Sequence, residues 1–221
     1  MSDKYQDVFQ HSTVWKRYFR YQMWTYLSGH VLEVGAGIGG TTAVLCSNKI
    51  KWFCVEPNED NYNRLDHQYK MHGTITDVKG EYDTVLYVDV LEHIHDDKRE
   101  IQEAGQRLRI GGNLIILVPA HQFLFSGFDA AIGHYRRYNK CSLLTCLPAG
   151  FIVKRLRYLD SCGMLASIAN KLIHDDKMPT VGQVLFWDRV IVPCSIVLDA
   201  LTGYTLGKSV LMVATKDGGA E

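Results

Sequence analysis

Short apolar runs alternate with helix-like segments through the first half of the chain. Runs such as HVLEVG, DTVLYVD and NLIILV are nearly continuous, as in strands that are buried on both faces of a sheet. The predicted strands are 30–35, 51–56, 74–77, 83–89 and 113–118, and the predicted helices between them are 39–47, the segment after Asn58, and 96–108. Strands that alternate with helices predict an α/β fold with a mostly parallel sheet.

The pattern becomes less regular after Pro119. We predict a long loop, a helix and a strand, then a mostly apolar helical stretch that is broken at Pro179 and Pro193, and a closing strand. These segments are 121–137, 139–147, 151–159, 161–203 and 209–215. Before the first strand, apolar and aromatic side chains recur at helical spacing between Phe9 and Leu27, which predicts one or two amphipathic helices.

This pattern favours a single domain over residues 1–221. By the family resemblance described below, an N-terminal helical lid would occupy 1–28, a cofactor-binding half 30–120, and a substrate half 121–217 with a helical insertion at about 161–203. The insertion could cap the acceptor site, with Phe186 and Trp187 lining it. It could equally be a core-facing aromatic stripe, or it could contact a membrane surface.

Composition narrows the function classes. The chain has 221 residues, 47% of them hydrophobic, and its 24 Lys and Arg balance 24 Asp and Glu, so the formal net charge is zero. A neutral chain is not typical of nucleic-acid binding, and we do not expect that partner. The apolar stretch 184–201 contains Asp188, Arg189 and Asp199, so we predict no membrane span and a cytoplasmic protein.

A glycine-rich turn follows the first predicted strand, in the sequence VLEVGAGIGG from Val31 to Gly40. Gly35, Gly37 and Gly40 satisfy the G-x-G-x-x-G spacing of dinucleotide sites, so an NAD-dependent oxidoreductase is one reading. Glu33 argues against it, because a carboxylate near the turn would repel a pyrophosphate. The same carboxylate suits S-adenosylmethionine, which has no phosphates and carries a sulfonium and an ammonium group.

Acidic residues end the later strands at the same predicted edge of the sheet. Glu56 ends the second strand and could accept the two hydroxyls of a ribose, while Asp89 ends the fourth and faces the same crevice. Asp77 follows the third predicted strand and could approach an adenine.

These pieces together resemble the class I S-adenosylmethionine-dependent methyltransferases. The resemblance rests on Glu33-x-Gly35-x-Gly37-x-Gly39, Glu56, DVLEH from Asp89, and LRIGG from Leu108, in the family's order. It implies a doubly wound, Rossmann-like, mostly parallel seven-stranded sheet with an antiparallel last strand, with the N-terminal helix and the helical cap as additions. S-adenosylmethionine is the implied cofactor.

The resemblance also implies which residues bind the cofactor. The glycine loop and Glu33 would hold the methionine end, Glu56 the ribose, and Asp89 and Val90 would line the crevice. Many relatives place an acid after the residue that corresponds to Gly73, where this chain has Thr74, so either Thr74 or Asp77 would meet the adenine. The full expected set is Glu33, Gly35, Ala36, Gly37, Gly39, Glu56, Pro57, Thr74, Asp77, Asp89 and Val90.

Catalytic candidates come from the loop after the fifth strand, which contains GHYRRY from Gly133. His134 is the expected general base, since an imidazole titrates near neutral pH, and Tyr135 and Arg136 are further candidates. The alternative is that His134 and Tyr135 brace the loop while Arg136 pairs with an acid.

Asp89, Glu92 and His93 permit a divalent-metal site, because some methyltransferases carry a similar acid-x-x-Glu-His patch. We expect no metal, and the alternative role for Glu92 and His93 is to cap the following turn.

The function predicted from the sequence is methyl transfer from S-adenosylmethionine to an oxygen or nitrogen of a small molecule. Hydrophobic and lipid-linked acceptors are both open. The alternatives are the NAD-dependent oxidoreductase and a methyltransferase-like binding protein without activity. An exposed apolar cap could also pair with a second copy in a homodimer.

Overall fold

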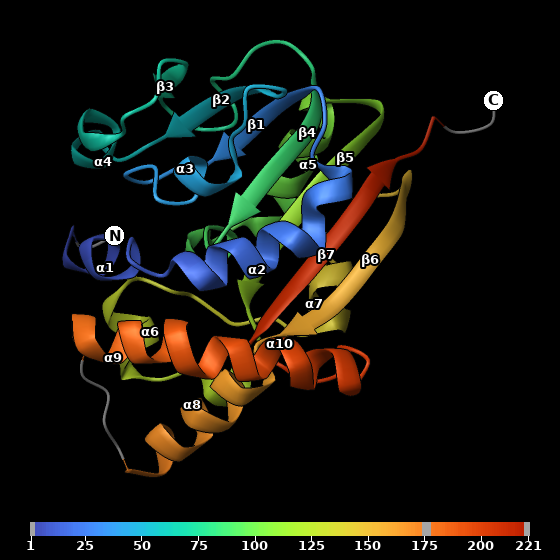
Figure 1. Ribbon diagram of the computed structural model, residues 1–221. Helices are drawn as coiled ribbons and strands as arrows, with labels where there is room; N and C mark the ends of the chain where they lie inside the picture. Colours follow the sequence, from blue (N-terminus) through green and yellow to red (C-terminus); the bar gives the residue numbers. More distant parts are fainter. Residues whose placement is uncertain (1–2, 174–177, 219–221) are drawn as a thin grey trace.

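A seven-stranded sheet forms the centre of the computed structural model, which describes residues 3–173 and 178–218 (Figure 1). The strand order is β3-β2-β1-β4-β5-β7-β6. The strands are β1 (His30–Val34), β2 (Lys51–Glu56), β3 (Lys70–His72), β4 (Tyr82–Val88), β5 (Leu108–Pro119), β6 (Phe151–Leu159) and β7 (Ser209–Lys216).

The last strand runs against its neighbours, as expected. β7 inserts between β5 and β6 and is antiparallel to both, whereas β1 to β5 pair in parallel. Leu114 to Val118 of β5 and Val210 to Ala214 of β7 are fully buried. Burial on both faces explains why these strands are continuously apolar in sequence.

Helices cover both faces of the sheet (Figure 1). On one face α5 (Asp97–Arg107) and α7 (Lys140–Leu144) bury Ile101, Ala104 and Leu143 against β1, β4 and β5. On the other face α2 (Thr13–Met23), α3 (Thr42–Leu45) and α10 (Val192–Leu201) contribute to a second core cluster. The doubly wound, Rossmann-like architecture expected from the sequence is confirmed.

Several predicted boundaries are wrong. The third strand is Lys70–His72 and not 74–77, because the Asp77 carboxylate accepts the Thr74 backbone N–H (2.8 Å) and folds that segment into a turn. The helix predicted at 39–47 is reduced to α3. The segment 121–137, predicted as a loop, contains η3 (Gln122–Leu124) and α6 (Gly127–Ala131). The remaining short helices are α1 (Asp3–Phe9), η1 (Trp24–Tyr26), α4 (Glu59–Arg64) and η2 (Leu91–His93).

The helical insertion comprises α8 (Ser161–Ile173) and a continuous helical segment of α9 (Val181–Phe186), η4 (Trp187–Ile191) and α10. The predicted break at Pro179 lies in the connection before α9. The break predicted at Pro193 is wrong, since the chain stays helical there. A π-helical turn, η4, directly precedes this proline and changes the hydrogen-bond pattern where a backbone N–H is missing.

Buried aspartates attach this insertion to the N-terminal helix. Both carboxylate oxygens of Asp188 accept backbone N–H groups at the start of α2, from Val14 (3.1 Å) and Trp15 (2.8 Å). Ser12, at the N-cap position, donates instead to the Phe9 carbonyl (2.6 Å). Asp188 is therefore the cap of a helix that lies more than 170 residues away in sequence.

Asp199 and Asp160 extend the same connection. Asp199 accepts the Tyr18 hydroxyl (2.7 Å) and the backbone N–H groups of Asp160 (2.8 Å) and Ser161 (2.9 Å). Asp160 in turn accepts the Trp187 indole N–H (2.8 Å) and the Ser195 hydroxyl (2.5 Å). These contacts join α2, the end of β6 and the cap.

We expect Asp188→Ala to lower the free energy of unfolding by about 2–4 kcal/mol, because two N–H groups at the start of α2 lose a charged, buried acceptor. Urea unfolding at pH 7 measures this. Asp66→Ala is the control, since Asp66 is exposed, and should change stability by less than about 0.5 kcal/mol. Equal effects of the two substitutions would show that Asp188 is not the cap.

Candidate active site

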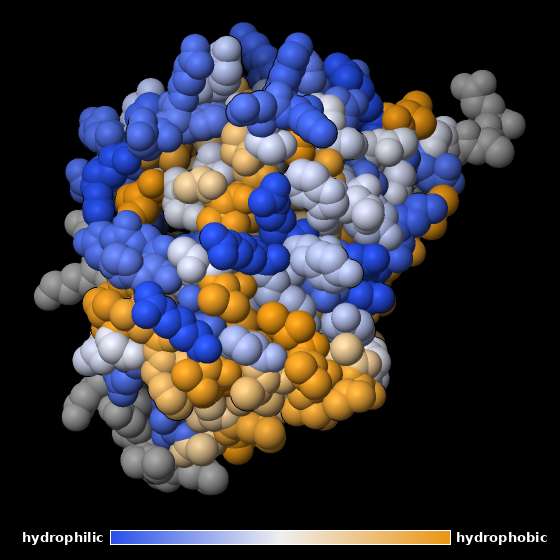
Figure 2. Space-filling model, viewed as in Figure 1, coloured by the Kyte–Doolittle hydropathy of each residue, from blue (hydrophilic) through white to orange (hydrophobic). Residues whose placement is uncertain are grey.

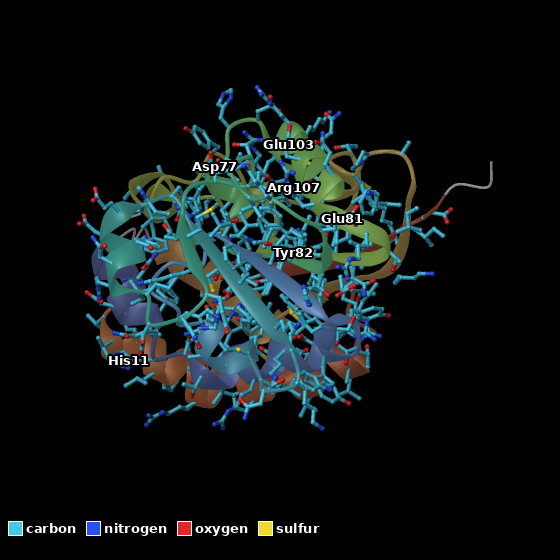
Figure 3. All side chains as sticks on the ribbon, turned by 90° about the horizontal axis from the view of Figure 1, so that it is seen from above. His11, Asp77, Glu81, Tyr82, Glu103 and Arg107 are labelled. Atoms are coloured by element: carbon cyan, nitrogen blue, oxygen red, sulfur yellow. The ribbon has the colours of Figure 1, made fainter. Side chains whose placement is uncertain are left out.

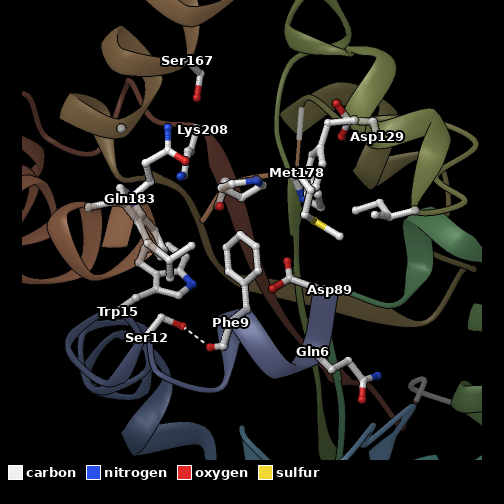
Figure 4. Close-up of a pocket in the computed structure, with 18 of the residues that line it drawn as sticks. Gln6, Phe9, Ser12, Trp15, Asp89, Asp129, Ser167, Met178, Gln183 and Lys208 are labelled. Atoms are coloured by element: carbon white, nitrogen blue, oxygen red, sulfur yellow. Dashed lines mark hydrogen bonds between the residues drawn. The ribbon is translucent and has the colours of Figure 1, made fainter. Parts of the chain in front are cut away.

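A cavity of about 1030 Å³ opens at the carboxyl ends of β1, β4 and β5 (Figure 4). Its floor is the glycine-rich loop after β1. Its walls come from α1, α2 and α6, and residues of α8 and α9 form its roof. Open α/β sheets bind ligands at this edge, so the cavity has the position of a cofactor and substrate site.

The glycine-rich loop after β1 adopts backbone conformations that favour glycine. Gly35, Gly37 and Gly39 all have positive φ, at +68°, +59° and +87°. A Cβ on Gly35 would lie 2.7 Å from the Val90 side chain, so only glycine fits there. Gly35, Ala36 and Gly37 line the cavity, while Gly39 packs toward Leu65.

Glu56 fixes this loop from the end of β2. Its carboxylate is buried and accepts the N–H groups of Gly37 (2.7 Å) and Asn58 (3.0 Å), and the Asn61 amide (3.3 Å). The neighbouring Pro57 is exposed. Glu56 therefore connects the second strand to the loop, and neither it nor Pro57 is among the cavity-lining residues.

Glu33 lies beneath the loop and is not one of the cavity-lining residues. Its carboxylate accepts the Thr42 hydroxyl (2.6 Å) and the Trp52 indole N–H (2.8 Å) and is 2% exposed. Burial raises the pKa of Glu33 to about 7, although these hydrogen bonds oppose the shift. Its observed contacts orient α3 and β2 beneath the loop.

Asp89 is a second carboxylate with a raised pKa and, unlike Glu33, it lines the cavity. It follows β4 with φ +54° and projects into the cavity (Figure 4). Burial raises the pKa of Asp89 to about 6, and charge interactions with the basic side chains His134, Lys208 and Lys16 limit the increase.

His134 also lines the cavity and is held by Asp129. The Nδ1 atom of His134 lies 2.8 Å from Asp129 Oδ1, and Arg137 donates to both oxygens of Asp129 (2.9 Å each). Burial alone would raise the pKa of Asp129, but the hydrogen bonds from His134 and Arg137 hold it well below its usual range. The result is a buried carboxylate that fixes the orientation of an imidazole on the cavity wall.

Comparison with known families decides the broad assignment. A family described as "Methyltransferase domain" matches residues 16–158, which is well over half of the chain. The chain belongs to this methyltransferase family. No curated protein sequence matches the chain.

Solved methyltransferase structures share the fold. One is a SAM-dependent methyltransferase from Archaeoglobus fulgidus, 16% identical, with a TM-score of 0.66 and coverage of 96% of this chain and 97% of that one. A S-adenosylmethionine-dependent methyltransferase from Clostridium acetobutylicum is 10% identical, with a TM-score of 0.62 and coverage of 98% and 99%. Phosphoethanolamine N-methyltransferase 2 from Haemonchus contortus, solved with S-adenosyl-L-methionine, is 14% identical, with a TM-score of 0.63 and coverage of 96% and 56%.

The structure of the methyltransferase does not bring every expected residue to the cavity. Thr74 and Asp77 form the turn described above, and neither lines the cavity. Figure 3 shows Asp77 in the same region as Arg107, whose guanidinium donates to the Thr76 carbonyl (3.5 Å). Hydrogen bonds from the backbone and side chain of Thr74 lower the pKa of Asp77.

Two of the three catalytic candidates point away from the cavity. Arg136 pairs with Asp97 (2.6 Å) and donates to the His95 carbonyl (2.8 Å), and Tyr135 is 55% exposed with its ring against His95. His134 and Arg137 line the cavity, whereas the two residues between them, Tyr135 and Arg136, face outward. Arg136 thus takes the acid-paired role that was the alternative at the sequence level.

The residues that could bind a metal ion differ from those suggested by the sequence. Ligand atoms of Glu92, His93 and His134 lie within 4.8 Å of one another, whereas the sequence had suggested Asp89 with Glu92 and His93. Both Glu92 oxygens are buried and have no hydrogen-bond partner among the described residues, and one lies 3.7 Å from His134 Nε2. Burial raises the pKa of Glu92 well above its usual range and lowers the pKa of His93 to about 4. These shifts favour a neutral Glu92 and a neutral His93 near pH 7.

Two cavity lysines were missed from the sequence. The Lys16 amine donates to the carbonyls of Phe9 and Gln10 (3.0 Å each), and burial lowers its pKa to about 8. Lys208 lies 3.4 Å from Asp160 and 4.0 Å from the Trp187 ring centroid. Lys208 directly precedes the apolar strand β7, and this position next to a predicted strand could have identified it as a candidate site residue.

The N-terminal segment lies over the glycine loop. Gln6 of α1 accepts the Ile38 N–H (3.1 Å), and Asp7 pairs with Arg64 of α4. Trp15 of α2, together with Phe186 and Trp187 of the insertion, lines the cavity, as expected for the two aromatic residues of the cap. The N-terminal lid expected at residues 1–28 stays a prediction, and its residues 1–2 lie outside the described part of the chain.

We expect Glu33→Gln to reduce the pH dependence of stability. The folded-state pKa of Glu33 is about 7, above its usual value of 4.5, so its contribution to stability is complete below pH 4.5 and is lost as pH rises through 7. The loss is on the order of 3 kcal/mol in the wild-type protein. Glutamine keeps an acceptor for Thr42 and Trp52 without the charge.

Urea unfolding at pH 5, 6, 7 and 8 measures the difference between the two proteins. Glu59→Gln, in the exposed first turn of α4, is the control and should leave the wild-type slope unchanged. A Glu33→Gln protein that loses stability with pH as steeply as the wild type would contradict the assignment of the raised pKa to Glu33.

Proposed function

We propose that this chain transfers a methyl group from S-adenosylmethionine to an oxygen or nitrogen of a small acceptor bound beneath the helical cap. The observation that carries the proposal is a glycine loop of the required backbone conformation at the floor of a cavity at the carboxyl edge of the sheet. The family assignment supports a methyltransferase over the NAD-dependent oxidoreductase. Binding without turnover would instead support the inactive binding protein.

The cofactor would lie along the loop at the ends of β1 and β2. Gly35, Ala36 and Gly37 line the cavity where its methionine end would lie, with Val90 packed against Gly35. Their backbone N–H groups donate to the Val55 carbonyl and to Glu56 in this structure, so a bound cofactor would have to replace some of these contacts. Glu56 would accept the ribose hydroxyls, exchanging its contact with the Gly37 N–H for them. S-adenosylmethionine carries its methyl on a sulfonium, so the donor is already activated when it binds.

The chain's own residues would orient the acceptor and remove its proton. His134 is the proposed general base, with Asp129 fixing its ring, as paired carboxylates do for catalytic histidines. The Nε2 atom of His134 lies 3.7 Å from Glu92, whose pKa is raised by burial. Asp89 would contribute a carboxylate on the side of the cavity nearest the cofactor.

The acceptor would be at least partly apolar. Phe186, Trp187 and Ile191 line the roof of the cavity, and Phe9 and Phe19 line the wall below them. Such walls suit an aromatic or aliphatic body, which includes the hydrophobic and lipid-linked acceptors considered from the sequence.

We expect Glu56→Gln to weaken S-adenosylmethionine binding by about tenfold or more, because a carboxylate accepts two ribose hydroxyls better than an amide does. Isothermal calorimetry with S-adenosylmethionine measures this, and Glu59→Gln should bind as the wild type does. Unchanged affinity in Glu56→Gln would remove Glu56 from the cofactor site.

We expect His134→Gln to lower kcat by about 10²-fold or more and to change S-adenosylmethionine affinity by less than about threefold, since a base acts only on the acceptor's proton. The assay follows S-adenosylhomocysteine release with a panel of phenolic, amine and lipid acceptors. Tyr135→Phe, on the outward side of the same loop, is the control and should keep wild-type turnover. Full turnover in His134→Gln would exclude His134 as the base.

A further inference from the structure

The continuous helical segment of the cap, α9 to α10, buries most of its charged side chains and exposes many apolar ones. Along α9, η4 and α10 the polar residues Asp188, Ser195 and Asp199 are at most 1% exposed. Most of the exposed side chains are apolar, with Gln183 and Arg189 as polar exceptions. The largest exposed apolar side chains are Phe186, Val190, Val197 and Leu201, between 48% and 78% exposed. A helix whose carboxylates face inward and whose aliphatic residues face outward is not the usual surface helix of a water-soluble protein.

The apolar face continues onto neighbouring helices. Leu165 of α8 is 57% exposed, and α8 and α2 both pack against α10. Figure 2 shows hydrophobic side chains gathered over α8, α9 and α10, below a more hydrophilic band. A contiguous apolar patch of this kind marks an interaction site, whereas single exposed apolar residues do not.

Cationic and aromatic side chains border this face along α2. Arg17 is exposed, Arg20 stacks over the Trp24 ring (4.5 Å), and Tyr21 is 79% exposed. Arg189 is exposed within the apolar stripe itself. In the described residues of α2, α8, α9, η4 and α10, the acidic residues are Asp188 and Asp199, and both are buried. The exposed charges of these described helices are therefore positive, in a chain with zero net charge.

We propose that this face, formed by α2 and the outward side of α8 to α10, docks onto an anionic lipid surface. Apolar side chains would enter the boundary of the acyl chains, while the arginines and the aromatic border remain at the headgroups. Charge decides between this partner and a second copy of the chain, because two such faces would bring arginines together. Among the described residues no helix is long and apolar enough to cross a bilayer, so the contact is with the surface.

Docking in this orientation places the mouth of the cavity at the bilayer. Phe186 belongs both to the exposed apolar stripe and to the cavity lining, and Thr180 and Gln183 line the cavity on the same helix start. If the proposed methyltransferase function holds, an amphiphilic acceptor could pass from the lipid phase beneath the cap. The docking itself does not depend on that function.

The test is cosedimentation of the full-length protein with vesicles of phosphatidylcholine alone and with 30% phosphatidylglycerol, at about 50 mM and 500 mM salt. We expect binding to the anionic vesicles that decreases at high salt. Arg17→Glu with Arg189→Glu should reduce partitioning by about tenfold or more, and Val190→Ser with Val197→Ser by about tenfold.

Matched controls lie elsewhere on the molecule. Lys51→Glu reverses an exposed charge at the start of β2, and Ile110→Ser removes an apolar side chain that is 73% exposed. Both should bind vesicles as the wild type does, and circular dichroism confirms that every variant is folded. None of the substituted residues lines the cavity.

Three outcomes would overturn the proposal: no binding to anionic vesicles, equal loss in the controls, or a dimer by light scattering that Val190→Ser with Val197→Ser dissociates while vesicles are not bound. The last would assign the face to a second copy. Because vesicle binding is measured without turnover, a protein that binds vesicles and transfers no methyl group would contradict the proposed function alone.

Discussion

Burial of three aspartates beneath the cap is the constraint on which the arrangement of the molecule depends. A carboxylate without partners is costly inside a protein, so Asp160, Asp188 and Asp199 must each lie where N–H and O–H donors converge. Those donors belong to the start of α2, the end of β6 and the cap helices. Satisfying the carboxylates therefore fixes the position of the roof relative to the sheet. It also turns the polar side of the cap helix inward, which leaves its aliphatic side exposed.

The cavity follows from the same constraint. The sheet and the glycine loop provide a rigid floor, since Glu56 ties the loop to β2 and Glu33 supports it from beneath through Thr42 and Trp52. Gln6 and Trp15 close the N-terminal side, and their position depends on α2 being capped by Asp188. The floor is built from local sequence, whereas the roof is built from contacts between segments that are far apart in the chain. In a site made of two such halves, the helices that cover the cavity can change without changing the glycine-rich loop that would bind the cofactor.

The sequence predicted the floor well and the roof poorly. Continuous apolar runs located β1, β2, β4, β5 and β7, because burial on both faces leaves a strong pattern. The third strand was misplaced, since a three-residue edge strand carries little signal and the Thr74–Asp77 turn resembles a strand in composition. In the GHYRRY segment the residue types were informative but their directions were not, so Tyr135 and Arg136 were assigned to a cavity that only His134 and Arg137 reach. The sequence did not predict that α10 buries its polar side chains and exposes its aliphatic ones, since hydrophobicity alone predicts that the aliphatic side faces the core.

A carboxylate in the cavity would still favour a cationic cofactor, but that carboxylate belongs to Asp89 and not to Glu33. The Glu33 carboxylate accepts hydrogen bonds from Thr42 and Trp52 below the loop. Asp89, by contrast, lies on the cavity wall, where burial raises its pKa to about 6, so the group is mostly a carboxylate at neutral pH but a less stable one than in water. The cavity cations have partners of their own, since Lys16 donates to two carbonyls and Arg137 to Asp129. A sulfonium or ammonium beside Asp89 would stabilise that carboxylate, whereas a pyrophosphate at the same place would destabilise it further. The preference for S-adenosylmethionine over a dinucleotide therefore rests on the strand end after β4.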